Sequence, residues 1–257
     1  MPELSVDVLL VLVAAFAAGL IDAMVGGGGL IQIPALFAVY PNVPPPTLLG
    51  TSKFAGLFGT LSAVARYARK VVIPWRALLP LALGALVMSV GGARLASVVS
   101  PGVFRPLVPI MLLAVLIYVL WRKDLGGEHQ PRGFSGSHHA AGAALIAAIG
   151  FYDGFFGPGA GSLWIFVFVR CYGYDFLHAG AAARAVNVAS NAAALTYFAA
   201  HGLLLWQVGA GMAICNIAGA VLGARLALRG GSGFVRQAFI VIVSALILRT
   251  AWTAIHG

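Results

Sequence analysis

Two stretches of this sequence place an acidic residue beside a glycine-rich break in apolar surroundings. In the first stretch, Asp22 precedes four consecutive glycines, Gly26, Gly27, Gly28 and Gly29. In the second, Asp153 precedes Gly157, Gly159 and Gly161. Glycine leaves backbone amides uncovered, and a helix that starts there offers a site for an anion because its dipole and unpaired N–H groups favour negative charge. The alternative is that the glycines only allow a tight turn or close helix packing.

A cation follows each stretch at an equivalent position. Lys53 comes after Gly50-Thr51-Ser52, and Arg184 comes after three alanines. A cation within a membrane span costs from about 3 to more than 10 kcal/mol, so one that faces the interior of a helical bundle is a candidate functional residue. The competing interpretation is that both side chains extend to the membrane interface from helix ends. Two cations beside two glycine breaks favour the anion site.

Polar residues share a helix face with these cations. Asn187 and Asn191 lie three and seven residues after Arg184, on the same side of a helix. Ser52 lies next to Lys53. We expect these side chains to bind substrate together with the glycine amides, although the two asparagines would equally suit hydrogen bonds between neighbouring helices.

The two acids have three interpretations that the sequence leaves open. Asp22 and Asp153 are candidates for proton carriers, for charge partners of Lys53 or Arg184, and for caps that bind backbone amides in the glycine turns. No HExxH motif, no Ser/His constellation and no metal-ligand spacing accompanies them, so we predict no enzyme, no metal and no cofactor.

Composition identifies the environment of these residues. Of the 257 residues, 61% are hydrophobic and only 9% are charged, and the mean hydropathy is +0.97. Soluble domains carry about 25% charged residues, so the chain is predicted to be an all-α, polytopic integral membrane bundle. The net charge of +9 comes from scattered Lys and Arg without a basic stripe, which argues against nucleic acid as a partner.

Apolar segments are predicted along the whole chain. They cover 6–25, 29–40, 47–66, 77–98, 103–121, 139–156, 160–173, 178–200, 206–228 and 234–254. The segment 29–40 reaches only about 18 Å as a helix, too short to span alone. We therefore expect one short, glycine-broken helix in each set of five.

An internal repeat relates the two sets. Asp153 lies 131 positions after Asp22, and the same offset joins Lys53 to Arg184 and Trp75 to Trp206. We predict a first repeat over 1–121, a linker over 122–138 and a second repeat over 139–257.

Loop charges predict the orientation of the repeats. Basic residues lie in the loop after 47–66 and in the linker, whereas the loops near 41–47, 99–103 and 199–205 carry no Lys or Arg. With basic loops inside, each half crosses an odd number of times, and the repeats are inverted with both termini outside. In the alternative, the short segments are re-entrant and each half spans four times.

Several of these motifs resemble those of a known family. The pattern G-x-x-D-A-x-x-G-G-G-G after the first helix, the sequence Gly50-Thr51-Ser52-Lys53, the linker and the weaker second half are similar to the sulfite exporter TauE/SafE permeases, also called the 4-toluene sulfonate uptake permease family. The resemblance implies a permease for small sulfur-containing oxyanions such as sulfite, sulfoacetate or other sulfonates. It also implies proton-linked transport in the bacterial inner membrane.

A passive anion channel is the alternative function, because the same cations would serve a conducting pore. The lipid bilayer and a small organosulfur anion are the expected partners. The sequence leaves open whether the protein forms a homodimer.

Overall fold

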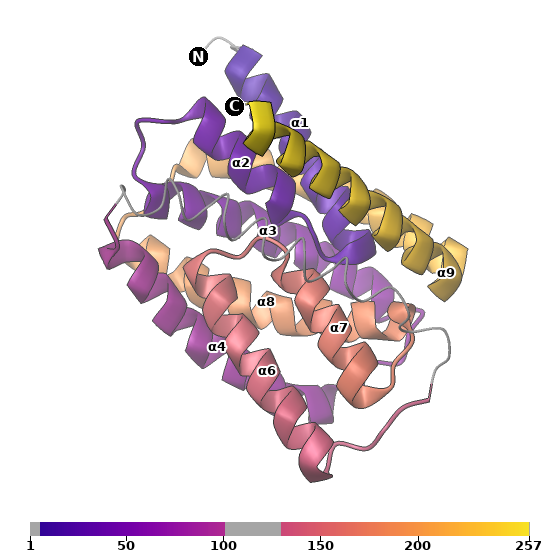
Figure 1. Cartoon of the computed structure of the whole chain (residues 1–257). Coiled ribbons are helices and arrows are strands. Elements are labelled where there is room, and N and C mark those ends of the chain that lie inside the picture. Colours follow the sequence, from indigo (N-terminus) through magenta and orange to yellow (C-terminus); the bar gives the residue numbers. More distant parts are fainter. Residues whose placement is uncertain (1–5, 101–129, 257) are drawn as a thin grey trace.

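The computed structural model describes residues 6–100 and 130–256, with side chains described for most residues up to Gln237. The predicted segment 103–121 and the first part of the linker, 122–129, lie outside the described residues. Every secondary-structure element within the described residues is a helix (Figure 1). The helices are α1 (Val6–Val25), α2 (Gly29–Val39), α3 (Pro45–Tyr67), α4 (Trp75–Val98), α6 (Gly136–Phe155), α7 (Ala160–Tyr172), α8 (Phe176–Ala200) and α9 (Trp206–His256).

Glycine and proline set the helix boundaries. α1 ends before Gly26, whose φ of 79° lies in the left-handed region that glycine adopts without steric cost. α7 begins after Gly159, whose φ is 78°. α3 starts with Pro45, which suits the first helical position because its missing N–H would have no intrahelical partner. α9 is two helices joined by a kink at Gly231, with φ 70° and ψ −171°, so the predicted segments 206–228 and 234–254 correspond to its two parts.

Four described helices are long and apolar enough to cross a membrane by length and composition. They are Asp7–Val25, Pro45–Tyr67, Trp75–Val98 and Trp206–Gly231. Their outer faces expose large apolar side chains, such as Leu79 and Val87, as expected for contact with lipid. The prediction of an all-helical membrane protein is confirmed.

The short helices turn back on the helices that precede them. α2 has 11 residues and α7 has 13, which gives about 16 and 20 Å of helix. α2 packs against α1 and α7 packs against α6, and Figure 1 shows each short helix returning toward the end at which its partner begins. The two glycine breaks are therefore the tips of two helical hairpins.

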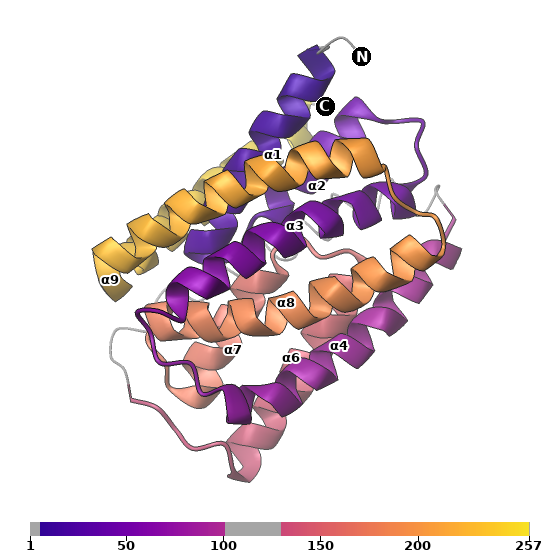
Figure 2. The ribbon, with the colours of Figure 1, turned by 180° about the vertical axis from the view of Figure 1, so that it is seen from behind.

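The helices form two packed groups, and each group contains one helix from the other half of the sequence. One group contains α1, α2, α3 and α9, and the other contains α4, α6, α7 and α8. Within the groups, α1 packs on α9 and α4 packs on α6, whereas the principal contact between the groups is α3 against α8. Figures 1 and 2 show α4 beside α6 from both sides. The fourth helix of each half thus completes the group of the other half.

Equivalent glycines make equivalent contacts in the two groups. Gly19 on α1 packs against the backbone of Asn216 on α9, and Gly150 on α6 packs against the backbone of Ala85 on α4. Gly150 lies 131 positions after Gly19, and Asn216 lies 131 positions after Ala85. These two close helix approaches thus occur at positions with the same offset, because each requires an absent side chain.

The α4–α6 crossing provides a test of this packing. A Cβ atom added at Gly92 would lie 2.6 Å from the backbone nitrogen of Phe155. A Cβ at Gly84, on the same helix, would lie 3.9 Å from the Cβ of Ala147, an ordinary contact. Gly92→Ala is therefore expected to destabilise the protein by about 1–3 kcal/mol, measured as a lower thermal unfolding midpoint in detergent. Gly84→Ala is the matched control, and equal midpoints for both variants would contradict the packing.

Candidate functional site

The tips of the two hairpins meet in the middle of the molecule. The amide of Ser162, in the first turn of α7, donates to the carbonyl oxygen of Gly26 at 3.0 Å. The Ser162 hydroxyl donates to the carbonyl oxygen of Val25 at 2.8 Å. Gly26 packs directly against the backbone of Gly161, where a side chain on either residue would collide with the other tip. The glycines thus bring the starts of α2 and α7 together.

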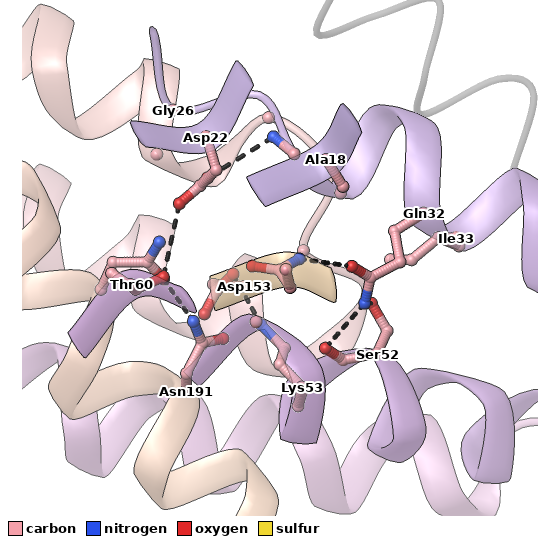
Figure 3. A pocket seen from close by; sticks show the side chains of 18 residues that line it. Ala18, Asp22, Gly26, Gln32, Ile33, Ser52, Lys53, Thr60, Asp153 and Asn191 are labelled. Atoms are coloured by element: carbon pink, nitrogen blue, oxygen red, sulfur yellow. Dashed lines mark hydrogen bonds and ion pairs between the residues drawn. The ribbon is translucent and has the colours of Figure 1, made fainter. Parts of the chain in front are cut away.

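A small polar cavity lies beside these tips, between the two helix groups (Figure 3). Its volume is about 60 Å³, enough for several water molecules or one small ion. It is lined by Ala18, Asp22, Gly26, Gly28, Gly29, Gln32, Ile33, Ser52, Lys53, Gly56, Thr60, Asp153, Gly157, Gly159, Gly161, Asn187, Asn191 and Asn216. Seven of the eight described helices contribute to this lining, so the site exists only in the folded bundle.

A buried ion pair crosses the cavity between the groups. The Nζ of Lys53 on α3 lies 2.7 Å from Oδ1 of Asp153 on α6, and both side chains are more than 90% buried. The Ser190 hydroxyl on α8 donates to the other oxygen of Asp153 at 2.6 Å. Figure 3 shows the Lys53 side chain directed from α3 toward Asp153. The cation of the first half is therefore paired with the acid of the second half.

Asp22 occupies the equivalent acidic position with much weaker partners. Its Oδ1 accepts from the amide of Gly28 at 3.4 Å, and its Oδ2 accepts from the Thr60 hydroxyl at 3.3 Å. No Lys or Arg nitrogen of the described residues lies within ion-pair distance of this carboxylate. The side chain is only partly buried because it borders the cavity.

Arg184 binds the backbone of the Asp22 residue and not its carboxylate. The guanidinium Nη2 donates to the Asp22 carbonyl oxygen at 2.7 Å, and the group lies 4.7 Å from the centre of the Tyr67 ring. The Tyr67 hydroxyl in turn donates to the Ala23 carbonyl oxygen at 2.9 Å. Arg184 is 2% exposed, and its Nε and Nη1 have no hydrogen-bond partner among the described residues. Arg184 therefore holds α8 against the end of α1.

A chain of amides covers another part of the cavity wall. The Asn216 amide on α9 donates to Oε1 of Gln32 at 2.9 Å, and the Gln32 amide donates to the Ser52 hydroxyl and carbonyl oxygens, both at 3.0 Å. On α8, the Asn191 amide donates to Oδ1 of Asn187 at 3.0 Å. These groups supply uncharged donors beside the Lys53 ammonium.

The structure brings most of the predicted site residues to this one cavity. Lys53, Ser52, the two asparagines of α8, both acids and six of the seven predicted glycines line it. Gly27 and Arg184 are not among the lining residues. Asn216 was not singled out from the sequence, because its equivalent in the first half is Ala85 and no repeat signal marks it. A lone amide in an apolar helix was the available clue.

Comparison with known proteins agrees with this architecture. A profile of the family described as sulfite exporter TauE/SafE matches residues 11–250. A probable membrane transporter protein of Sinorhizobium sp., ORF9, is 37% identical over 92% of this chain and 89% of its own length. Probable membrane transporter protein YfcA of Escherichia coli K12 is 37% identical over 95% of this chain and 88% of its own length.

A further relative comes from Haemophilus influenzae, a probable membrane transporter protein that is 34% identical over 95% of this chain and 94% of its own length. No solved structure matches the chain significantly. The family match covers residues 11–250 and includes every residue that lines the cavity. The chain therefore belongs to the sulfite exporter TauE/SafE family of multi-pass membrane transporters, a family of transporters and not of enzymes.

Proposed function

We propose that this protein is a proton-linked secondary carrier of small sulfur-containing oxyanions, such as sulfite, sulfoacetate or other sulfonates, in the bacterial inner membrane. The observation that carries the proposal is the buried Lys53 ammonium on the wall of a small polar cavity at the hairpin tips. Burying a cation within a membrane protein is costly because the charge loses its hydration. Such cations are therefore rare, and those that line a cavity typically belong to a substrate or ion pathway. Family membership supports the same substrate class.

Lys53 supplies the charge that attracts the anion in this proposal. The amides of Gly29 and Gly161, at the starts of α2 and α7, have no hydrogen-bond partner among the described residues and are placed to donate to sulfonate or sulfite oxygens. Asn187 and Asn191 add side-chain donors on α8. Arg184 contributes its charge from behind the α1 tip without lining the cavity.

The exchange of helices between the two groups supports inverted repeats that alternate access. The two hairpins enter the middle of the molecule and meet at their tips, as two related halves of opposite orientation would do. Rocking one group against the other around the fixed tips would open the cavity to one side of the membrane at a time. The Lys53–Asp153 pair joins the groups and would have to open during this motion.

Binding and uptake by the purified protein test the proposal. Sulfite, thiosulfate, sulfoacetate and methanesulfonate are expected to raise the thermal unfolding midpoint, since a ligand that binds only the folded state stabilises it, by about 2.7 kcal/mol at 100 times its Kd. Acetate is the control anion. At least one stabilising anion should then accumulate in proteoliposomes against its gradient when the lumen is alkaline. Uptake that follows membrane potential but ignores the pH gradient would favour a channel, and no response to any sulfur anion would contradict the substrate class.

A further inference from the structure

The two acids of the cavity differ in how firmly their negative charge is held. Asp153 accepts from the Lys53 ammonium at 2.7 Å and from the Ser190 hydroxyl at 2.6 Å. Asp22 accepts only from an uncharged amide at 3.4 Å and an uncharged hydroxyl, that of Thr60, at 3.3 Å. Charge-assisted hydrogen bonds are shorter and about twice as strong as neutral ones. The carboxylate form of Asp153 is thus stabilised more strongly by its direct partners than that of Asp22.

Among the described residues, the charged groups that act on Asp22 lie on three other helices. Arg184 approaches from α8, Lys53 from α3 and Asp153 from α6. Arg184 donates from Nη2 to the Asp22 carbonyl oxygen, and Lys53 forms an ion pair with Asp153. In the part of the chain that the structure describes, Asp22 therefore has no cation within ion-pair distance, although its side chain borders the cavity through which a proton could arrive.

Counting charge then connects the acid to the anion. With Lys53, Arg184, Asp22 and Asp153 all ionised, the site has two positive and two negative charges and is neutral. A bound monovalent anion leaves it with one excess negative charge, which is costly where the surrounding dielectric is low. A single proton on an Asp22 carboxylate oxygen restores neutrality without breaking the Asp153 ion pair.

We propose that Asp22 is the binding site of the coupled proton, and that Asp153 remains the fixed counter-ion of Lys53. This inference rests on the proposed carrier function and sharpens it. One proton bonds to a carboxylate oxygen of Asp22 on the acidic side, travels with one monovalent anion, and leaves on the other side. Transport of a monovalent anion is then electroneutral. Both contacts are compatible with a proton on Oδ2, because the Thr60 hydroxyl can accept a hydrogen bond from the neutral acid while the Gly28 amide still donates to Oδ1.

Asp22→Asn is the decisive variant, since asparagine has the shape of the protonated acid and can still accept hydrogen bonds. The probe is labelled methanesulfonate, which keeps one negative charge at every pH used. In proteoliposomes, wild-type protein is expected to accumulate it when the lumen is alkaline, without a response to membrane potential. Asp22→Asn is expected to retain exchange of internal for external methanesulfonate and to lose pH-driven accumulation at least about tenfold. Asp7→Asn, the same change at an exposed position of α1, should retain both.

The outcomes separate this assignment from the carrier function itself. If wild-type protein exchanges and accumulates methanesulfonate but Asp22→Asn still accumulates it with pH, the proton site is elsewhere and the inference is wrong. Loss of exchange and accumulation together in Asp22→Asn, with an unfolding midpoint equal to that of the wild type, would also overturn it, since Asp22 would then serve the anion. If the wild type moves none of the tested sulfur anions, the proposed function fails instead. Asp153→Asn is expected to impair exchange as well as accumulation, because it removes the partner of Lys53.

Discussion

Lys53→Gln is expected to abolish anion uptake while leaving the rest of the cavity in place. The ammonium is the one Lys or Arg charge that lines the cavity among the described residues. Removing one partner of a buried, hydrogen-bonded charge pair typically costs about 2–5 kcal/mol, which corresponds to a loss of roughly 30-fold to more than 1000-fold in affinity. Initial rates of labelled sulfite uptake into proteoliposomes measure the effect. The stabilisation of the protein by sulfite should disappear with it.

Two further variants separate binding from folding at this position. Lys53→Gln leaves the Asp153 carboxylate buried without a cation, a change that costs about 3–5 kcal/mol of stability in comparable pairs. Combining it with Asp153→Asn removes both charges and is expected to recover the unfolding midpoint without recovering uptake. Lys70→Gln, in the exposed loop after α3, should behave as wild type. Recovery of uptake in the double variant would show that Lys53 only balances Asp153 and does not attract the anion.

Arg184→Gln is expected to lower stability strongly, because Arg184 joins α8 to the end of α1. It removes the 2.7 Å bond to the Asp22 carbonyl oxygen and the contact with the Tyr67 ring. A hydrogen bond from a charged donor contributes about 1.5–3 kcal/mol, and a buried cation–π contact about 2 kcal/mol. The thermal unfolding midpoint should fall by several degrees in the absence of any ligand. Uptake should fall as well, because the α1 tip that borders the cavity loses its anchor on α8.

The choice of replacement identifies which property of Arg184 matters. Arg184→Lys keeps the charge and the contact with the aromatic ring but loses the planar fork of donors, so an intermediate midpoint is expected. Arg225→Gln, at an exposed position of α9, is the matched control and should leave the midpoint unchanged. A wild-type midpoint in Arg184→Gln, together with loss of the sulfite-induced shift, would instead make Arg184 a direct ligand of the anion.

Most of the helical organisation was predictable from local features of the chain. The observed α1 ends at Val25 and α2 begins at Gly29, as the apolar runs and the glycine break indicate, because helix boundaries depend on nearby residues with special backbone preferences. The common offset of 131 positions was also recognisable from the chain alone. Lys53 and Arg184 are rare residues in an apolar chain, so one common offset is enough to relate them.

The partners of the charged residues were not predictable in the same way. The sequence left open whether Asp22 and Asp153 pair with the cations, carry protons or cap the glycine turns. In the structure these roles are divided, since Asp153 holds Lys53 whereas Asp22 contacts the Gly28 amide. Such a division depends on differences of a few tenths of an ångström in the distances between side chains and their partners, which the sequence does not reveal.

The sequence by itself determined that this is an all-helical membrane protein, and it placed an acid, a glycine break and a cation twice at a common offset of 131 positions. Apolar length, breaks and repetition are properties of the linear chain, so no fold was needed to find them. Only the tertiary structure decided that α4 and α9 pack with the opposite half, that Lys53 faces the cavity, and that Arg184 lies behind the α1 tip. Residues at the same offset, such as Ala85 and Asn216, differ in chemistry and therefore give their neighbours different surroundings. Equivalent positions in the chain therefore do not have equivalent roles in the site.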